Sequence, residues 1–384
     1  MTFHSYRNTV TRPPQKNYWD ERYYGLGFSR DPRDRCTLVI GDGFTRSFLN
    51  SQSIPNIYSC SIEGHFREKE NLLYVPVEGD RFEKGVLWEQ NKWPRLFELW
   101  SDFGVDDPRE FYDSIAKAYI NPDKSIGAIT YSTASVGFEL RCYLWHLFRS
   151  QHYYLFREGV KYNVSNWEWY EPLRILMSEY ALGVANFNYD LIAEHIIGGL
   201  NHAVNIVAHE LGGVDRYKHR PCDSIALYKL HGAISYYYET GQGSCANPWL
   251  VDARYSRNQV VNPHLNIDVD MRNFPEFPDI VPPGHYGADK IVPDSNVSVL
   301  CKDHISNSSL VIFCGLSAEE PDTAEVRDLI QQISSESRVI HVGLENDKSG
   351  VLAALLQQQK CNYQFMLPEQ LKSFSVIKRD GGIE

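Results

Sequence analysis

The sequence predicts an α/β protein built on a Rossmann-like, doubly wound parallel sheet. Short apolar runs typical of buried strands alternate with amphipathic segments of helical spacing. Several of these runs end in glycine or a polar residue just before a helix begins, as at Gly41, Asn188 and Gly315. This alternation favours parallel strands joined by helices, because parallel neighbours need a crossover connection.

Composition sets limits on the class of protein. Hydrophobic residues make up 43% and charged residues 23% of 384 residues, which suits a globular chain with a sizeable core. A net charge of −11 argues against a broad basic surface for nucleic acid. The eight cysteines form no C-x-x-C pair, so reduced thiols are expected and no metal site. No apolar run approaches membrane-spanning length, and we expect a soluble cytoplasmic protein with no membrane partner.

The first predicted strand ends in a glycine-rich turn. Residues 1–35 are polar and are expected to form an N-terminal arm. Residues 36–40 follow as a buried strand, and Gly41-Asp-Gly-Phe-Thr45 leads into a helix that starts near 46–50. Glycines let backbone N–H groups approach a phosphate, and a helix N-terminus favours its charge. The alternative is a plain tight turn. The usual third glycine is missing, and Asp42 brings a carboxylate into the loop.

Two insertions interrupt the strand-helix pattern. The first, about 60–175, is predicted to be mainly helical. It contains a strand at 72–77 and helices at 93–103, 108–118, 133–148 and 169–180. Its many aromatic residues would form either a core or a surface for a partner. The second, about 241–300, is rich in Gly, Pro, Asn and Asp and is predicted to be irregular.

The segment 182–190 combines a buried strand with a polar tip. The strand stops at Asn186-Phe-Asn-Tyr-Asp190, and an amphipathic helix begins at once over 191–197. Ligands sit at the carboxyl ends of strands in open α/β sheets, which places Asn188 and Asp190 for chemistry. Taken alone, Asp190 is better explained as a helix cap than as an active-site residue.

Further strands follow the same pattern. The predicted strand 224–230 ends in His231-Gly232, and histidine is readily poised as a base near neutral pH. A core histidine is the alternative. The strand 309–314 ends in Gly315-Leu-Ser317, and other predicted strands occupy 203–208 and 338–342, the last ending at Gly343. Helices are predicted after Pro321 and over 350–358.

Four of these strand-end features occur in an order that resembles the sirtuin-like family of NAD-consuming enzymes. They are Gly41-Asp-Gly-Phe-Thr45, Asn188-Tyr-Asp190, Leu230-His-Gly232 and Gly315-Leu-Ser317 followed by Pro321. The second and fourth look like the forms of the bacterial sirtuin-like branch. The zinc ribbon of deacetylating sirtuins is absent after the His-Gly element, which argues against protein deacetylation. Asp42 replaces the usual Ala or Asn, and Thr45 replaces Ser.

The resemblance implies that residues 36–384 form one NAD-binding domain that cleaves the nicotinamide–ribose bond. His231 would be the general base, Asn188 would hold the ribose or water, and Asp190 would bind the carboxamide or fix the loop. Residues Gly41, Asp42, Gly43, Phe44, Thr45, Gly315, Ser317 and Gly343 would bind the rest of NAD.

The resemblance also implies a biological setting. The chain would be an NAD hydrolase of antiphage defence that depletes NAD in infected bacteria, acting as a homo-oligomer or with a companion sensing protein. Two alternatives stand beside it. One is a module that binds NAD or an ADP-ribose derivative without turnover, which Asp42 favours. The other is a structural subunit that works through its aromatic insertion. Hydrolysis and cyclisation of the ADP-ribose product both stay open.

Overall fold

The computed structural model of the chain describes residues 34–52, 66, 72–76, 82–103, 107–120, 136, 139–149, 163–200, 206–208, 225–238, 277–283, 296–318 and 323–371. Residues 1–33 of the expected arm lie outside this part of the chain. So does most of the segment 241–300 that the sequence predicts to be irregular.

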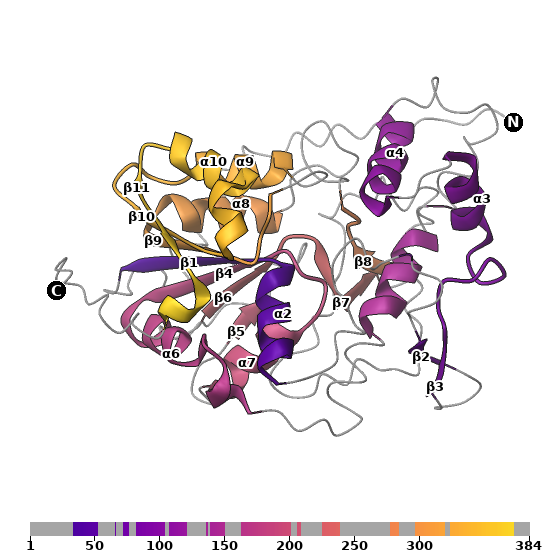
Figure 1. Cartoon of the computed structure of the whole chain (residues 1–384), viewed down its shortest axis with the longest axis horizontal. Coiled ribbons are helices and arrows are strands. Elements are labelled where there is room, and N and C mark those ends of the chain that lie inside the picture. Colours follow the sequence, from indigo (N-terminus) through magenta and orange to yellow (C-terminus); the bar gives the residue numbers. More distant parts are fainter. Residues whose placement is uncertain are drawn as a thin grey trace, which may run out of the picture.

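Seven parallel strands in the described part of the chain form one sheet, in the order β11-β10-β9-β1-β4-β6-β5 (Figure 1). All neighbouring pairs run parallel. The strands are β1 (Arg35–Ile40), β4 (Ala181–Asn186), β5 (Ile206–Ala208), β6 (Ile225–Lys229), β9 (Ser308–Cys314), β10 (Arg338–Val342) and β11 (Asn362–Met366). The predicted fold class is confirmed.

Helices cover both faces of the sheet (Figure 1). One face packs against α2 (Asp42–Ser51), α6 (Tyr170–Glu179) and α7 (Ile192–Leu200). The other packs against α8 (Asn296–Ser306), α9 (Thr323–Gln331) and α10 (Val351–Gln358). Because both faces are covered, the central strands read as continuous apolar runs, and all six residues of β4 are buried.

The strand order reverses at β1. From β1 the chain reaches β4 on one side, and it later returns to β9 on the other side. In a doubly wound sheet such a reversal opens a crevice beyond the carboxyl ends of the strands concerned. The turns after β1, β4, β6 and β9 therefore share one edge of the sheet, although residues 41 and 315 are far apart in the sequence.

Most of the predicted elements that fall within the described residues are present, and three differences stand out. The helix α2 begins at Asp42, four residues before the predicted start at 46, so residues 42–45 form a helical turn and Asp42 is not a loop residue. The helix α8 was not predicted, and its start lies within the segment expected to be irregular. The predicted strand at 72–77 is β2 (Leu72–Pro76), which pairs antiparallel with β3 (Phe82–Val86) outside the main sheet.

The first insertion contributes helices and a buried aromatic cluster. Its helices are α3 (Pro94–Phe103), α4 (Pro108–Ile120) and a helical stretch over 139–149, and the short η5 (Val164–Asn166) precedes α6. Aromatic rings of the insertion pack against one another, with centroid distances of 4.2 Å in the pair Trp88–Phe97 and 5.3 Å in the pair Phe66–Tyr143. Trp88, Phe111 and Tyr143 are almost fully buried. The described aromatic residues thus form a core, which was one of the two expectations for them.

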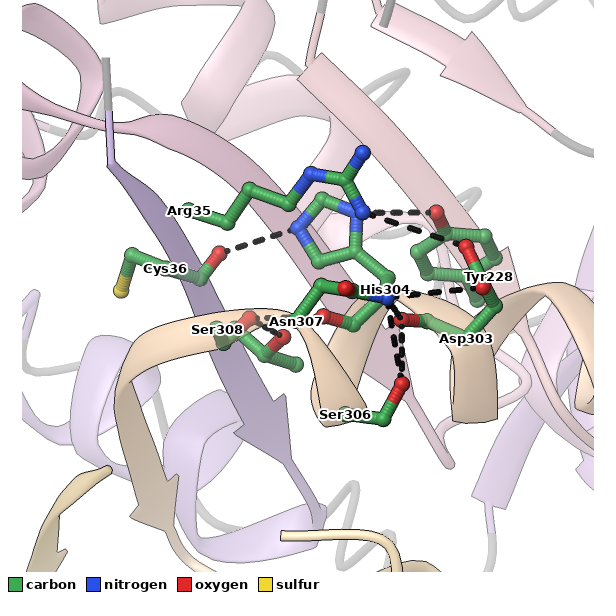
Figure 2. A network of polar contacts seen from close by, with 9 residues as sticks. Arg35, Cys36, Tyr228, Asp303, His304, Ser306, Asn307 and Ser308 are labelled. Carbon is green, nitrogen blue, oxygen red and sulfur yellow. Dashed lines mark hydrogen bonds and ion pairs between the residues drawn. The ribbon is translucent and has the colours of Figure 1, made fainter. Parts of the chain in front are cut away.

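A buried histidine attaches α8 to the sheet (Figure 2). The ring of His304 lies 3.2 Å from the Tyr228 hydroxyl of β6 and 3.3 Å from the Cys36 carbonyl of β1. That carbonyl adjoins an irregularity in the pairing of β1 with β9, between Arg35 and Cys36. Gly183 of β4 leaves room for the ring, since a Cβ there would stand 2.6 Å from His304 Nε2. These contacts attach α8 to the face of the sheet opposite α2.

Candidate functional site

The candidate site lies at the carboxyl ends of the adjacent strands β9, β1, β4 and β6. Each of these strands ends at one of the four features found in the sequence: Gly315, Gly41, Phe187-Asn188 and Leu230-His231 respectively. Backbone bonds between neighbouring turns link them, because Phe187 N donates to Ile40 O at 3.0 Å and Leu230 N donates to Asn186 O at 3.1 Å. The sheet therefore brings together residues that span most of the chain.

The glycines of two turns interlock. Gly41 N donates to Cys314 O at 3.0 Å, and Gly43 N donates to Gly315 O at 2.9 Å. A Cβ on Gly43 would lie 2.6 Å from the Gly315 Cα, and Gly315 itself has φ of +64°, where side chains are strained. Phe44 N donates to Gly41 O. Three N–H groups of the expected phosphate loop are therefore bound to carbonyls, and the glycines hold two turns in contact.

Asp42 occupies the first turn of α2 and pairs with Arg46 one turn later at 2.7 Å. A carboxylate near a helix N-terminus is stabilised by the helix dipole, which explains an acidic residue at this position. The pairing also turns the Asp42 charge toward a cation. A carboxylate paired with a cation in this way repels a nearby anion less than an unpaired carboxylate would.

Asn188, Thr45 and Asp190 form a buried hydrogen-bonded group. Asn188 Nδ2 donates to Gly41 O at 2.9 Å and to Thr45 Oγ1 at 3.0 Å. Thr45 Oγ1 donates in turn to Asp190 Oδ2 at 3.2 Å. Asp190 Oδ1 accepts from Ile192 N at 2.8 Å at the start of α7, so the cap interpretation of Asp190 is confirmed. The group ties the turn after β1 to the turn after β4.

A buried ion pair lies next to this group and is bonded to it. Lys229 at the end of β6 lies 3.0 Å from Glu194 of α7, and its Nζ donates to Asp190 O at 2.6 Å. Burial raises the pKa of Asp190 and of Glu194, and the Lys229 charge opposes both shifts. Sequence reasoning missed Lys229 and Glu194. A lysine inside the apolar run Ile225–Leu230 was the available signal, since lysine is almost never fully buried without a partner.

His231 pairs with a carboxylate that the sequence did not point to. Its Nε2 lies 2.7 Å from Glu325 Oε2 in the first turn of α9, and both side chains are about 5% exposed. The Phe187 ring stands edge-on to the imidazole at 5.2 Å, and the Tyr189 ring lies 6.1 Å away. Glu325 looks like an ordinary acidic residue of a helix start, so no signal in the sequence marked it.

The backbone around His231 is also fixed. Val281 N donates to His231 O at 2.9 Å, and Tyr189 OH donates to Val281 O at 2.7 Å. These contacts join β7 (Gly232–Tyr238) and β8 (Phe277–Ile280), an antiparallel pair beyond β6, to the turn after β4. The imidazole is bordered by side chains from α9 and from the turn after β4, and the His231 backbone is bound to Val281.

The helical stretch 139–149 of the first insertion reaches the same region. Trp145 Nε1 donates to Ile234 O at 2.9 Å, three residues after His231. The Phe148 ring packs against the Tyr189 ring at 5.0 Å. The insertion therefore borders the segments that carry His231 and Asn188, a contact that sequence patterns did not indicate.

The remaining predicted residues lie at the edge of the site. Ser317 is exposed, two residues beyond Gly315. Gly343 follows β10, which is separated from β1 by β9, and its N–H donates to Met366 O at 3.1 Å. Neither belongs to the hydrogen-bonded group of Gly41, Thr45, Asn188 and Asp190.

Among the residues that the structure describes, no group of three or more His, Cys, Asp or Glu side chains is placed to hold a metal ion. Five cysteines in this part of the chain are free thiols: Cys36, Cys142, Cys301, Cys314 and Cys361. None of the described helices has the length and apolar character needed to cross a membrane.

Comparison with known proteins adds little. No protein-family model matches the chain, and no curated protein matches it. Among solved structures it aligns with one described as a mutant of Sir2 homologues in complex with 2'-O-acetyl ADP ribose, at 11% identity. The alignment covers 94% of this chain and 99% of the other, with a TM-score of 0.32. A likeness at that score carries no conclusion about the family, activity or ligand of this chain.

Proposed function

We propose that the chain is an NAD glycohydrolase that cleaves the nicotinamide–ribose bond with water and releases nicotinamide and ADP-ribose. The observation that carries this proposal is the meeting of four sirtuin-like sequence features at one edge of the sheet, after β9, β1, β4 and β6. That edge contains the strand-order reversal where doubly wound folds bind nucleotides.

The chemistry is a glycosidic displacement through an oxocarbenium-like transition state. His231 acts as general base toward a ribose hydroxyl or the attacking water. Asn188 uses its Nδ2 for Gly41 and Thr45, so its amide is oriented and its Oδ1 is the atom left for a ribose hydroxyl or water. Asp190 has both carboxylate oxygens engaged, which favours fixing the loop over binding the carboxamide.

The nucleotide phosphates would lie near the N-terminus of α2. The N–H groups of Gly41, Gly43 and Phe44 are occupied by carbonyls, so the loop backbone offers fewer donors than the sequence suggested. The helix dipole of α2 supplies positive potential there instead, while Arg46 offsets the charge of Asp42. Gly315, Ser317 and Gly343 would line the wall beside the ribose and the adenosine.

Two alternatives are less well supported. A binding module without turnover was favoured by Asp42, but Asp42 pairs with Arg46 at a helix start. A structural subunit that works through an aromatic surface does not fit the described aromatic residues of the insertion, because Trp88, Phe111 and Tyr143 are buried.

The setting follows from the sequence resemblance alone. By that resemblance, the chain works in the bacterial cytoplasm as an NAD-depleting effector of antiphage defence and causes abortive infection. It assembles as a homo-oligomer or acts with a companion sensing protein, and NAD is its substrate, with no metal cofactor and no direct nucleic-acid contact.

Nicotinamide release from NAD tests the proposal, measured beside NAD binding by calorimetry. We expect His231→Ala to lose at least about 100-fold in rate, the usual contribution of a positioned base. Asn188→Ala should also lower the rate, because Asn188 orients the ribose or the water. Asn346→Ala, at an exposed asparagine, serves as the matched control and should keep the wild-type rate. Wild type that binds NAD without releasing nicotinamide, alone or with its activator, would point to the binding module instead.

A further inference from the structure

The imidazole of His231 has two nitrogens, and the structure shows what one of them contacts. Nε2 lies 2.7 Å from Glu325 Oε2, across the interface between the β6–β7 turn and α9. An ionised carboxylate can only accept a hydrogen bond, so Nε2 must carry a proton in this contact. In the neutral imidazole Nδ1 is then the unprotonated nitrogen, which is the form of nitrogen that a general base uses.

Glu325 is well placed to keep its negative charge. It belongs to the first turn of α9, where the helix dipole stabilises an anion. The chain enters α9 through Ala318, whose φ of +57° is uncommon for a residue with a side chain, and Thr323 Oγ1 donates to Ala318 O at 2.9 Å. The start of α9, and with it the carboxylate, is therefore held in a defined position.

The pair is also shielded from solvent. The His231 and Glu325 side chains are 4% and 5% exposed. A hydrogen bond to an ion is stronger when buried than at a surface, since water does not compete for the donor. Phe187 and Tyr189 restrict the ring on its other sides.

From this geometry we propose that Glu325 is the positioning residue of His231: it sets the imidazole tautomer with the proton on Nε2 and leaves Nδ1 as the basic nitrogen. This inference rests on the proposed function, in which His231 is the base. It adds a residue that none of the four sequence features contains. Glu325 acts through His231 and does not itself touch NAD.

Glu325→Gln is the sharpest variant. Glutamine keeps the side-chain volume and a hydrogen-bonding group, but it removes the charge and can offer either an N–H or a C=O to Nε2. It therefore no longer selects one tautomer. Asp328→Asn is the matched control, since Asp328 lies on the same helix and pairs with Lys302 of α8 at 2.5 Å, away from His231. It reports any effect of weakened α9 docking.

The first measurement is steady-state nicotinamide release. Hydrogen-bond partners that orient metal-binding histidines contribute roughly 10- to 100-fold, and by the same orienting effect Glu325→Gln should lower kcat by a similar factor. KM should stay within about threefold, because the lost interaction serves the reaction and not ground-state binding. Asp328→Asn should match wild type. Wild-type kcat in Glu325→Gln, or an equal loss in Asp328→Asn, overturns the inference while leaving the proposed function intact.

The second measurement does not depend on turnover. Histidine-selective ¹⁵N NMR distinguishes protonated from unprotonated ring nitrogens, and His231→Asn identifies the His231 signals by their loss. We expect a protonated Nε2 in wild type and a mixed pattern in Glu325→Gln. A proton on Nδ1 alone in neutral wild-type His231 would refute the pairing. Wild type that neither binds nor cleaves NAD would instead sink the proposed function, and the NMR result would still decide the Glu325 contact.

Discussion

Gly315→Ala tests whether the interlocked turns organise the site. Gly315 adopts φ of +64°, and a Cβ there would lie 2.5 Å from Gly43 C and 2.6 Å from Gly43 Cα. Both are backbone atoms that no side-chain rotation can move away. Ordinary contact begins at 3.4 Å, so the turn after β1 and the turn after β9 must separate.

The expected loss of stability follows from two effects. A residue with a Cβ in the left-handed region costs roughly 1–2 kcal/mol. Separation of the turns also breaks the bonds from Gly43 N to Gly315 O and from Gly41 N to Cys314 O, each worth about 0.5–1.5 kcal/mol. The free energy of unfolding should therefore fall by roughly 2 to 5 kcal/mol, a large part of the 5–15 kcal/mol typical of proteins.

Urea unfolding followed by tryptophan fluorescence measures this loss. Gly350→Ala provides the control, because Gly350 has φ of −74° and a Cβ there meets its nearest atom at 3.3 Å. That variant should change stability by about 0.5 to 1 kcal/mol at most. NAD affinity should fall in Gly315→Ala only. If both alanine variants unfold at the same urea concentration as wild type, the two turns do not depend on close backbone contact.

Three further predictions concern buried polar groups. Lys229→Met should destabilise the fold by roughly 3–5 kcal/mol because it leaves Glu194 buried and unpaired, and adding Glu194→Gln should recover part of the loss in urea unfolding. Burial lowers the pKa of His341 from 6.5 to about 4, so the folded state holds it neutral while the unfolded chain protonates it. Stability should therefore fall as pH drops from 6.5 through about 4, and His341→Gln should remove on the order of 3 kcal/mol of that dependence, as unfolding measured between pH 4 and 8 will test. Asn188→Ala should cost about 1–3 kcal/mol by removing the donor that Gly41 O and Thr45 Oγ1 share; an unchanged melting temperature would contradict this.

Local sequence was enough to predict most elements. The strands β1, β4, β6 and β9 are apolar runs because the helices on both sides bury them, and a glycine or a polar residue at or shortly after the end of each one marks its carboxyl end. The helix α8 escaped prediction because it begins in a segment rich in turn-forming residues. For the antiparallel pair of β2 and β3, the sequence predicted β2 but not β3. An apolar run does not reveal which strand it will pair with.

For the candidate site, the four strand-end features came from the sequence, and so did the two interpretations of Asp190. The sequence by itself determined which residue types stand at the strand ends, since each depends on its immediate neighbours. Only the tertiary structure decided that Gly315 packs on Gly43, that Lys229 lies against Glu194, and that Glu325 meets His231. Such contacts depend on strand order and helix docking. These bring together residues that are far apart in the chain, and the local sequence around one residue does not indicate the other.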